Sequence, residues 1–209
     1  MERLGRERRG RRELTGHPFL DRVAQALARH TPALAERDPP YREAAVALIL
    51  VPDADDARLL LLRRAVHPGD PWSGQVGLPG GRFEPGDGSL FETAVRETRE
   101  ETGLDLSGAT VLGVLDEIRP RKPQLPPIIV RPHVVTIPDT LPLSPSEEVA
   151  ELFWAPLGDL FSPSRMLRTE VEARGMQMAV DAIDFEGRII WGMTERILRS
   201  LQRVLDRIQ

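Results

Sequence analysis

The sequence predicts a single α+β domain in which helices pack on a mixed β-sheet. Three observations support this class. The chain has 209 residues, about the size of one domain, and its 41% apolar and 29% charged residues are an ordinary globular composition. Short apolar runs alternate along the chain with segments of helical periodicity. No internal repeat divides the chain.

The first elements expected are a surface helix and a β-hairpin. Residues 19–30 (FLDRVAQALARH) carry apolar side chains three and four residues apart, which is typical of a helix with one buried face. Residues 44–51 form a short, β-branched apolar run, which predicts a buried strand. An Asp-rich turn separates this run from a second one at 58–64, so we expect the two strands to form a hairpin. Residues 65–89 are rich in Gly and Pro and predict a long ordered loop, a feature that often carries function.

A capped helix is expected next, at residues 90–102. Ser89 and Glu92 have the spacing of a capping box, in which the hydroxyl accepts a backbone N–H and the carboxylate reaches back to the helix start. Gly103 suits the left-handed conformation that ends helices. With about 100° of rotation per residue, the buried face is expected to consist of Phe91, Ala94, Val95, Thr98 and Thr102.

The rest of the chain predicts further strands and a closing helix. After an apolar segment at 109–118 we expect a strand at 128–137 interrupted by Pro132, an exposed loop at 138–148, a strand at 151–155, a hairpin at 183–191 that turns at Glu186 and Gly187, and an amphipathic helix at 194–208.

The composition excludes several classes of protein. The chain has no Cys, which excludes a disulfide scaffold, thiolate zinc sites and a Cys nucleophile. Its net charge of −4 does not suit a domain that binds nucleic acid as a whole. The longest apolar run, at 44–51, is far shorter than the roughly 20 residues of a membrane span, so we expect a soluble, cytoplasmic protein without a membrane partner.

The first 16 residues predict a disordered basic tail, and the folded domain is expected to occupy residues 17–209. Residues 2–13 hold six Arg and three Glu with almost no apolar side chain, a composition that cannot bury a core. An alternative interpretation is an arm that binds an anionic ligand such as RNA.

One face of the helix at 90–102 carries three carboxylates. Setting Glu97 at 0° places Glu101 at about 40° and Glu100 at about −60°. These charges repel, and Arg96, four residues before Glu100, offsets part of the repulsion, so the pattern alone is that of a solvated surface. The preceding LPGG sequence, however, allows close approach of the backbone. Clustered carboxylates suit Mg²⁺ or Mn²⁺, which hold phosphates and activate water.

At these residues the chain resembles the Nudix family. The segment Gly81–Leu104 is similar to the Nudix signature, with the core R-E-x-x-E-E-x-G-L intact from Arg96 onward. Asp87 stands in place of the signature's first Glu, one residue further from Arg96, which resembles the coenzyme A pyrophosphatase-type Nudix enzymes. Other stretches similar to that subgroup are residues 74–81, 148–157 and 190–194, so the resemblance spans residues 44–205.

The resemblance implies an α/β/α sandwich that hydrolyses the pyrophosphate bond of a nucleoside diphosphate-linked small molecule, with coenzyme A or a derivative as the first candidate. The run at 60–65 lacks the Thr and Ser of the subgroup's upstream motif, which keeps ADP-ribose, NADH, FAD and a capped RNA end as alternatives. A non-catalytic nucleotide-binding module is a further alternative, although such a module is expected to lack the metal-binding carboxylates. Because relatives are commonly dimers, a homodimer is also an expectation.

Each carboxylate of the helix then has an implied role. The implied ligands of Mg²⁺ or Mn²⁺ are Glu97, Glu101, Glu100 and the carbonyl of Gly81. Arg96 is expected to orient Glu100 and not to touch the substrate. The base that activates water is either Glu101, through metal-bound water, or Glu148 in the loop before the next strand.

Three arginines are candidates for binding the diphosphate through bidentate contacts: Arg63, Arg64 and Arg82. Arg64 is preferred because it ends a strand that leads into the Gly-rich loop. Trp72 is expected either to stack on a base or to close a hydrophobic lid. Trp154 and Trp191 lie beside strand-like runs and are expected in the core.

Overall fold

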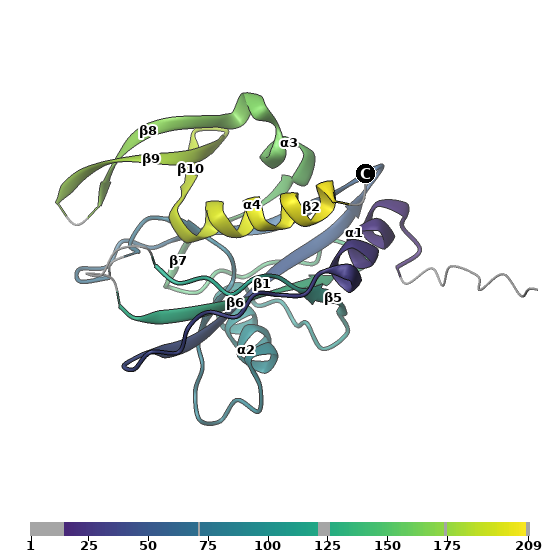
Figure 1. The fold of residues 1–209 in the computed structure, drawn as a ribbon, viewed down its shortest axis with the longest axis horizontal. Helices are drawn as coiled ribbons and strands as arrows, with labels where there is room; N and C mark the ends of the chain where they lie inside the picture. Colours follow the sequence, from purple (N-terminus) through teal and green to yellow (C-terminus); the bar gives the residue numbers. More distant parts are fainter. Residues whose placement is uncertain (1–14, 71, 121–125, 174, 208–209) are drawn as a thin grey trace, which may run out of the picture.

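The protein is built around a seven-stranded mixed β-sheet (Figure 1). The computed structural model describes residues 15–207 apart from residue 71, residues 121–125 and residue 174. The strands are β1 (Arg42–Asp53), β2 (Asp56–Arg64), β3 (Val76–Gly77), β4 (Gly80–Arg82), β5 (Thr110–Val114), β6 (Ile128–Thr136) and β7 (Val149–Pro156). They lie in the order β3-β2-β1-β6-β5, with β4 also paired to β1 and β7 to β2. β1 and β6 run parallel and the other pairs antiparallel, which confirms the predicted mixed sheet.

Helices cover both faces of this sheet, as an α/β/α sandwich requires (Figure 1). They are α1 (Pro18–Arg29), α2 (Leu90–Thr102), α3 (Leu157–Phe161) and α4 (Gly192–Asp206). α2 lies on one face, and α1, α3 and α4 pack into a separate cluster on the other. The three helices expected from periodicity are confirmed, and α3 is a short helix that the sequence did not predict.

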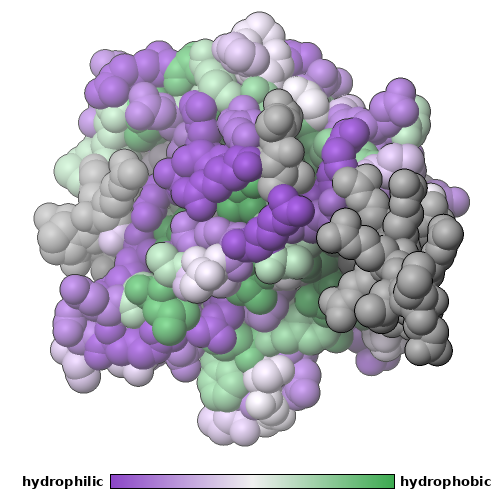
Figure 2. Space-filling view, turned by 45° about the vertical axis from the view of Figure 1, so that its right-hand side comes forward, coloured by the Kyte–Doolittle hydropathy of each residue, from purple (hydrophilic) through white to green (hydrophobic). Residues whose placement is uncertain are grey.

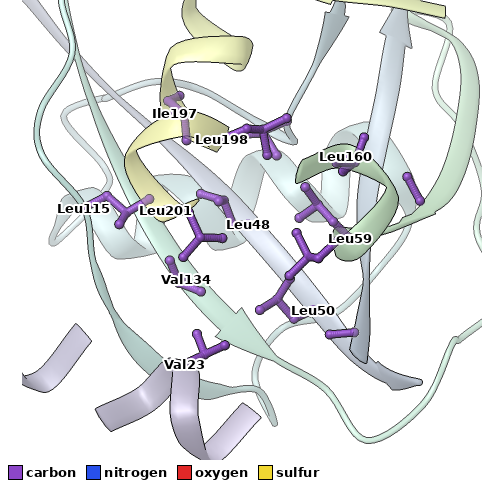
Figure 3. Packing of buried hydrophobic residues seen from close by; sticks show 14 of the residues in the cluster. Val23, Leu48, Leu50, Leu59, Leu115, Val134, Leu160, Ile197, Leu198 and Leu201 are labelled. Carbon is purple, nitrogen blue, oxygen red and sulfur yellow. The ribbon is translucent and has the colours of Figure 1, made fainter. Parts of the chain in front are cut away.

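The apolar run predicted as a buried strand supplies both halves of the core. In β1, Ala47 and Ile49 pack on the α2 side, whereas Leu48 and Leu50 pack on the side of α1 and α4. Successive side chains alternate across a strand, so a strand covered on both faces is apolar at every position. Figure 3 shows Leu48 beside Leu201 of α4 in the larger of these clusters.

The predictions for two strands had different outcomes. The hairpin is confirmed, because β1 and β2 pair antiparallel across a tight turn. The predicted interruption at Pro132 is wrong, because β6 continues through it from Ile128 to Thr136. The Pro132 carbonyl accepts the N–H of Leu115 at 3.1 Å, so the side where its own N–H is missing faces β5. Regular pairing with β5 ends at Val114, so the missing N–H lies where this ladder stops.

A second, three-stranded sheet was largely missed. It consists of β8 (Met166–Ala173), β9 (Met176–Phe185) and β10 (Arg188–Trp191), joined to the end of α3 by a 3-10 turn at Pro163–Arg165. The hairpin predicted at 183–191 is confirmed, with Glu186 (φ 52°) and Gly187 (φ 79°) at its turn. β8 and the first half of β9 were not predicted because these residues are partly exposed and show weak apolar alternation. In Figure 1 their hairpin projects from the body of the molecule.

A buried carboxylate fastens the segment before β1 to the sheet. The Glu117 side chain is 1% exposed and accepts hydrogen bonds from the Arg37 guanidinium at 2.9 and 3.0 Å. It also accepts the Ala35 N–H at 2.9 Å and hydrogen bonds from Arg131 of β6. Burial alone would raise the pKa of Glu117, but these donors outweigh burial and lower it. The carboxylate therefore stays charged, and it holds residues 30–41 against the end of β6.

A buried histidine in β6 makes stability depend on pH. His133 is 7% exposed, and its ring lies 5.4 Å from that of Phe91 in α2. Burial, and then the charge of Arg131, lower the pKa of His133 to about 4. An unfolded histidine titrates near pH 6.5, so the unfolded state binds more protons than the native state between pH 6.5 and 4. Stability is therefore lost as the pH falls through this window.

We expect His133→Leu to remove this loss of stability, which reaches about 3 kcal/mol at pH 4 in the native chain. His67→Gln replaces an exposed histidine, and this variant should still lose stability as the pH falls. Urea unfolding of the three proteins at pH 7, 5.5 and 4.5 measures the effect. The assignment is wrong if His133→Leu and the native chain lose stability equally over this range.

Several expectations about the chain as a whole remain predictions. Residues 1–14 of the predicted tail lie outside the described residues, and Thr15 donates its hydroxyl and N–H to Asp21 of α1 at 2.8 and 2.9 Å. None of the described helices is long and apolar enough to cross a membrane.

Figure 2 shows one face of the molecule, on which hydrophobic residues gather in patches between hydrophilic ones. The homodimer remains an expectation.

Candidate active site

The helix that carries the carboxylates begins and ends where its caps predict. α2 spans Leu90–Thr102, and the Ser89 hydroxyl accepts the N–H of Glu92 at 3.2 Å. Gly103 is left-handed, with φ 72°, and closes the last turn. One detail differs, because the Glu92 carboxylate accepts the N–H of Gly88 at 2.8 Å and not that of the cap residue. A Cβ at Gly88 would lie 2.7 Å from that carboxylate, so the glycine leaves room for the bond.

The three carboxylates of α2 line one cavity but differ in depth. The exposed fraction of the side chain is 6% for Glu101, 18% for Glu97 and 58% for Glu100. The buried residues of the helix are Thr93, Ala94, Thr98, Glu101 and Thr102. Phe91 and Val95 of the predicted buried face are only partly buried. The buried arc therefore extends past the apolar side chains and takes in part of the carboxylate face.

Burial raises the pKa of Glu101 to about 7. One hydrogen bond and one nearby positive charge favour its charged form, since Oε2 accepts the Gly80 N–H at 2.9 Å and Arg64 Nη1 lies 3.8 Å from Oε1. The charges of Glu97 and Glu148 oppose ionisation further. Burial also raises the pKa of Glu97. Ionisation of Glu97 and Glu101 is thus disfavoured, and carboxylates held in this way favour binding of a cation.

Two glycines bring the backbone against these carboxylates. A Cβ at Gly81 would lie 2.3 Å from the carboxyl carbon of Glu97. Gly80 has φ 147°, and a Cβ there would lie 2.2 Å from the carbonyl oxygen of Ala45. Glycine is required at position 80, where backbone is in the way, and at position 81 it leaves room for the Glu97 carboxylate. The Gly-Gly pair thus lets β4 run between β1 and the carboxylate face of α2.

We expect Gly81→Ala to lower activity about 10- to 100-fold with little change in stability, because the added methyl displaces the flexible Glu97 carboxylate and no backbone. Gly86→Ala is the matched control, since it lies in the loop after β4 and its Cβ would meet no atom within 4 Å. Initial rates and thermal unfolding of both variants test this. Equal activity of the two variants would contradict the placement of Glu97.

Arg96 links the groups around the start of α2. Its Nε and Nη2 donate to the two oxygens of Asp87 at 2.9 and 3.1 Å, and Nη1 donates to Glu97 and Glu100 at 3.0 Å each. Nη2 also donates to the Arg82 carbonyl at 3.0 Å. The hydrogen bonds from Arg96 hold the pKa of Asp87 well below its usual range. Arg96 therefore contacts Glu100, the carboxylate that it is predicted to orient, and its role stays a prediction.

Arg96 and the three carboxylates of α2 line a cavity of about 1230 Å³. The predicted site residues that line it are Arg64, Gly81, Arg82, Arg96, Glu97, Glu100, Glu101 and Glu148. Arg63 instead lines a neighbouring cavity, where its Nε lies 3.2 Å from Glu151. Successive residues of a strand point to opposite faces, which separates Arg63 from Arg64.

The opposite wall of the cavity comes from elements whose place beside the carboxylates was not predicted. Met178 of β9, Trp191 of β10 and Met193 of α4 line this wall together with Trp72. Trp191 was expected in the core but is partly exposed in the cavity, whereas Trp154 packs partly buried under α2. The sequence offered one signal for this wall, the similarity of residues 190–194 to the coenzyme A pyrophosphatase-type subgroup, but that similarity gave no position in space.

The donor set fits a hard divalent cation that keeps part of its water shell. Glu97, Glu101 and the backbone at Gly81 offer oxygen only, which favours Mg²⁺ or Mn²⁺ over zinc. Among the described residues, no group of three His, Cys, Asp or Glu is arranged to hold a metal ion. Mg²⁺ usually binds through one or two carboxylates, with water and phosphate oxygens as the other ligands. The buried carboxylate of Glu101 and the partly buried carboxylate of Glu97, beside an open cavity, meet that requirement.

Comparisons with known proteins agree on one family. A family model described as the NUDIX domain matches residues 40–175. The "Uncharacterized Nudix hydrolase NudL" of Yersinia pestis (strain Pestoides F) is 37% identical over 161 residues, which cover 77% of this chain and 78% of that protein. The protein of the same name from Yersinia pseudotuberculosis serotype O:1b (strain IP 31758) gives the same values.

A solved structure supports the fold. The MutT/nudix family protein from Enterococcus faecalis is similar with a TM-score of 0.55 over 82% of this chain and 64% of that chain. At 20% identity this likeness concerns the fold alone. One conclusion follows from the mixed sheet between helices, the glycine-flanked carboxylate helix and the matches over most of the chain. The chain belongs to the Nudix hydrolase family.

Proposed function

We propose that the protein hydrolyses the pyrophosphate bond of a nucleoside diphosphate-linked small molecule, with coenzyme A or a derivative as the preferred substrate. The observation that carries this proposal is the cavity itself. Its wall combines the carboxylates Glu97 and Glu101 with the cations Arg64 and Arg82. Carboxylates suited to a divalent cation beside guanidinium groups suited to phosphate form a site for a metal-bound diphosphate.

Nudix hydrolases generally use divalent metals, and this site would take Mg²⁺ or Mn²⁺. Glu97, Glu101 and the Gly81 carbonyl would hold the ion, and Glu100 would join them after leaving its hydrogen bond to Arg96. When bound, the metal lowers the pKa of a bound water and neutralises phosphate charge. Arg96 keeps Glu97 oriented throughout, because Nη1 bonds to it at 3.0 Å.

Two carboxylates are candidates for moving the proton of the attacking water. Glu101 is buried and would act through a water bound to the metal that it helps to hold. Glu148 lines the same cavity from the loop before β7 and is close enough for its charge to raise the pKa of Glu97 and Glu101. The pH dependence of kcat/KM in Glu148→Gln distinguishes them, because loss of the base removes the acidic limb of the profile.

The arginines have unequal support as diphosphate ligands. Arg64 and Arg82 line the cavity, and bidentate contacts from a guanidinium suit phosphate oxygens. Arg63 is paired with Glu151 beside the neighbouring cavity, so its contact with a substrate would require a ligand that extends there. We therefore assign the diphosphate to Arg64 and Arg82.

A substrate panel tests the proposal. The purified protein is assayed with Mg²⁺ and with Mn²⁺ on coenzyme A, ADP-ribose, NADH, FAD and capped RNA, with Glu101→Gln as the inactive control. Preferential cleavage of coenzyme A to 4′-phosphopantetheine supports the proposal. Preference for another member would show that the loop after Arg64 is adapted to a different ligand. Failure to cleave any member would favour a nucleotide-binding module without activity.

A further inference from the structure

Asp70, in the loop that joins β2 to β3, contacts the arginine assigned above to the diphosphate. Its Oδ2 accepts hydrogen bonds from both Nε and Nη2 of Arg64, at 3.1 and 2.9 Å. The Asp70 side chain is 17% exposed and lines the same cavity as the carboxylates of α2. On its other side, Arg64 Nη1 lies 3.8 Å from Oε1 of Glu101. Arg64 is thus held between Asp70 and Glu101.

The loop keeps Asp70 in a fixed place. Its Oδ1 accepts the N–H of Trp72 at 3.0 Å, so both oxygens of the carboxylate are engaged. The base of the loop is closed by the hydrogen bond from the Arg64 N–H to the Gln75 carbonyl at 3.0 Å. The loop therefore begins directly after Arg64, the last residue of β2, and carries its partner Asp70.

We propose that Asp70 is a positioning residue, which holds the Arg64 guanidinium in the orientation that binds the substrate's diphosphate; this rests on the function proposed above. A guanidinium has five N–H donors, and Asp70 occupies two of them while the Nη1 side faces the cavity. A long side chain that is ordered before binding loses less entropy when the phosphate arrives. Asp70 also keeps Arg64 from closing onto Glu101, a carboxylate that the proposed metal requires.

Asp70→Asn tests this proposal by replacing a single hydrogen-bond acceptor, the Oδ2 atom that contacts Arg64. Asn keeps an oxygen for the Trp72 N–H, but its NH₂ group cannot accept from Arg64. We expect kcat/KM for the best substrate of the panel to fall about tenfold, mainly through KM, because Arg64 loses the two hydrogen bonds that order it before binding. The matched control is Asp53→Asn, which removes the Asp53–Arg58 pair (3.2 Å) at the far end of the β1–β2 hairpin. It should leave kcat/KM unchanged, and both variants should unfold at the temperature of the native chain.

The same substitution in an Arg64→Ala background separates positioning from a purely structural role. If Asp70 acts through Arg64, the double variant has the kcat/KM of Arg64→Ala alone. The proposal is overturned if the kcat/KM of Asp70→Asn equals that of the native chain. It is also overturned if that kcat/KM is higher, which would mean that Asp70 competes with phosphate for Arg64. A tenfold loss of kcat/KM that persists in the Arg64→Ala background would overturn it as well. A native chain that cleaves nothing in the panel would overturn the proposed function as well, whereas an active chain with an unaffected Asp70→Asn overturns this inference alone.

Discussion

Replacing Glu101 by Gln is expected to lower hydrolysis about a thousandfold or more while the protein remains folded. Gln offers an oxygen to the Gly80 N–H, which Glu101 now accepts at 2.9 Å, so the packing of the loop is kept. The substitution removes the negative charge that the proposed divalent cation requires. Steady-state assays with Mg²⁺ and with Mn²⁺ measure the effect.

The same variant should be more stable in metal-free buffer above pH 7. The native pKa of Glu101 is raised to about 7 from an unfolded value of 4.5, so its stabilising contribution is complete below pH 4.5 and is lost as the pH rises to 7. Gln does not ionise, and we expect a gain of about 1–3 kcal/mol at pH 8. Glu92→Gln, on the exposed side of the same helix, is the control and should retain activity. An active Glu101→Gln enzyme would refute the assignment of Glu101 as a metal ligand.

Replacing Glu117 by Gln is expected to destabilise the protein by about 3–4 kcal/mol, because it breaks a buried ion cluster from its centre. The 1% exposed carboxylate accepts from two arginines and one backbone N–H. Without its charge, the guanidinium groups of Arg37 and Arg131 are left together with no partner of opposite sign between them. Urea unfolding at pH 7 measures the loss of free energy.

Glu43→Gln is the matched control for this second prediction. Glu43 contacts the same Arg37 at 3.4 Å, but its side chain is 34% exposed. An exposed pair of this kind contributes about 0–1 kcal/mol. If Glu117→Gln costs no more than Glu43→Gln, the cluster does not fasten the segment before β1. Because the pKa of Glu117 is lowered in the native state, its contribution is present above pH 4.5 and is lost on acidification.

Local signals placed the carboxylate helix because the interactions that bound it are local. Ser89 accepts from a residue three positions on, and the left-handed Gly103 needs no distant partner. The β1–β2 hairpin and the turn at Glu186 and Gly187 were likewise predictable, because turn residues and flanking apolar runs are adjacent in the chain.

Burial of the α2 carboxylates could be read only in part. The helical projection sets Glu101 nearest the apolar face, Glu97 next and Glu100 furthest, and their exposed fractions of 6%, 18% and 58% follow this order. The contacts of these side chains could not be read from the projection, because Glu101 accepts the Gly80 N–H and lies 3.8 Å from Arg64, both in distant segments. Burial raises the pKa of Glu101, and the groups that modify this shift lie far away in sequence.

The sequence by itself determined the family resemblance, the sheet flanked by helices and the carboxylates beside a Gly-Gly pair. Periodicity, caps and motif spacing depend on neighbours along the chain. Only the tertiary structure decided that Arg64 and not Arg63 lines the cavity, that Asp70 holds Arg64, and that β9, β10 and α4 supply the facing wall. These features depend on which faces of distant elements meet, and that is settled by packing of the whole core.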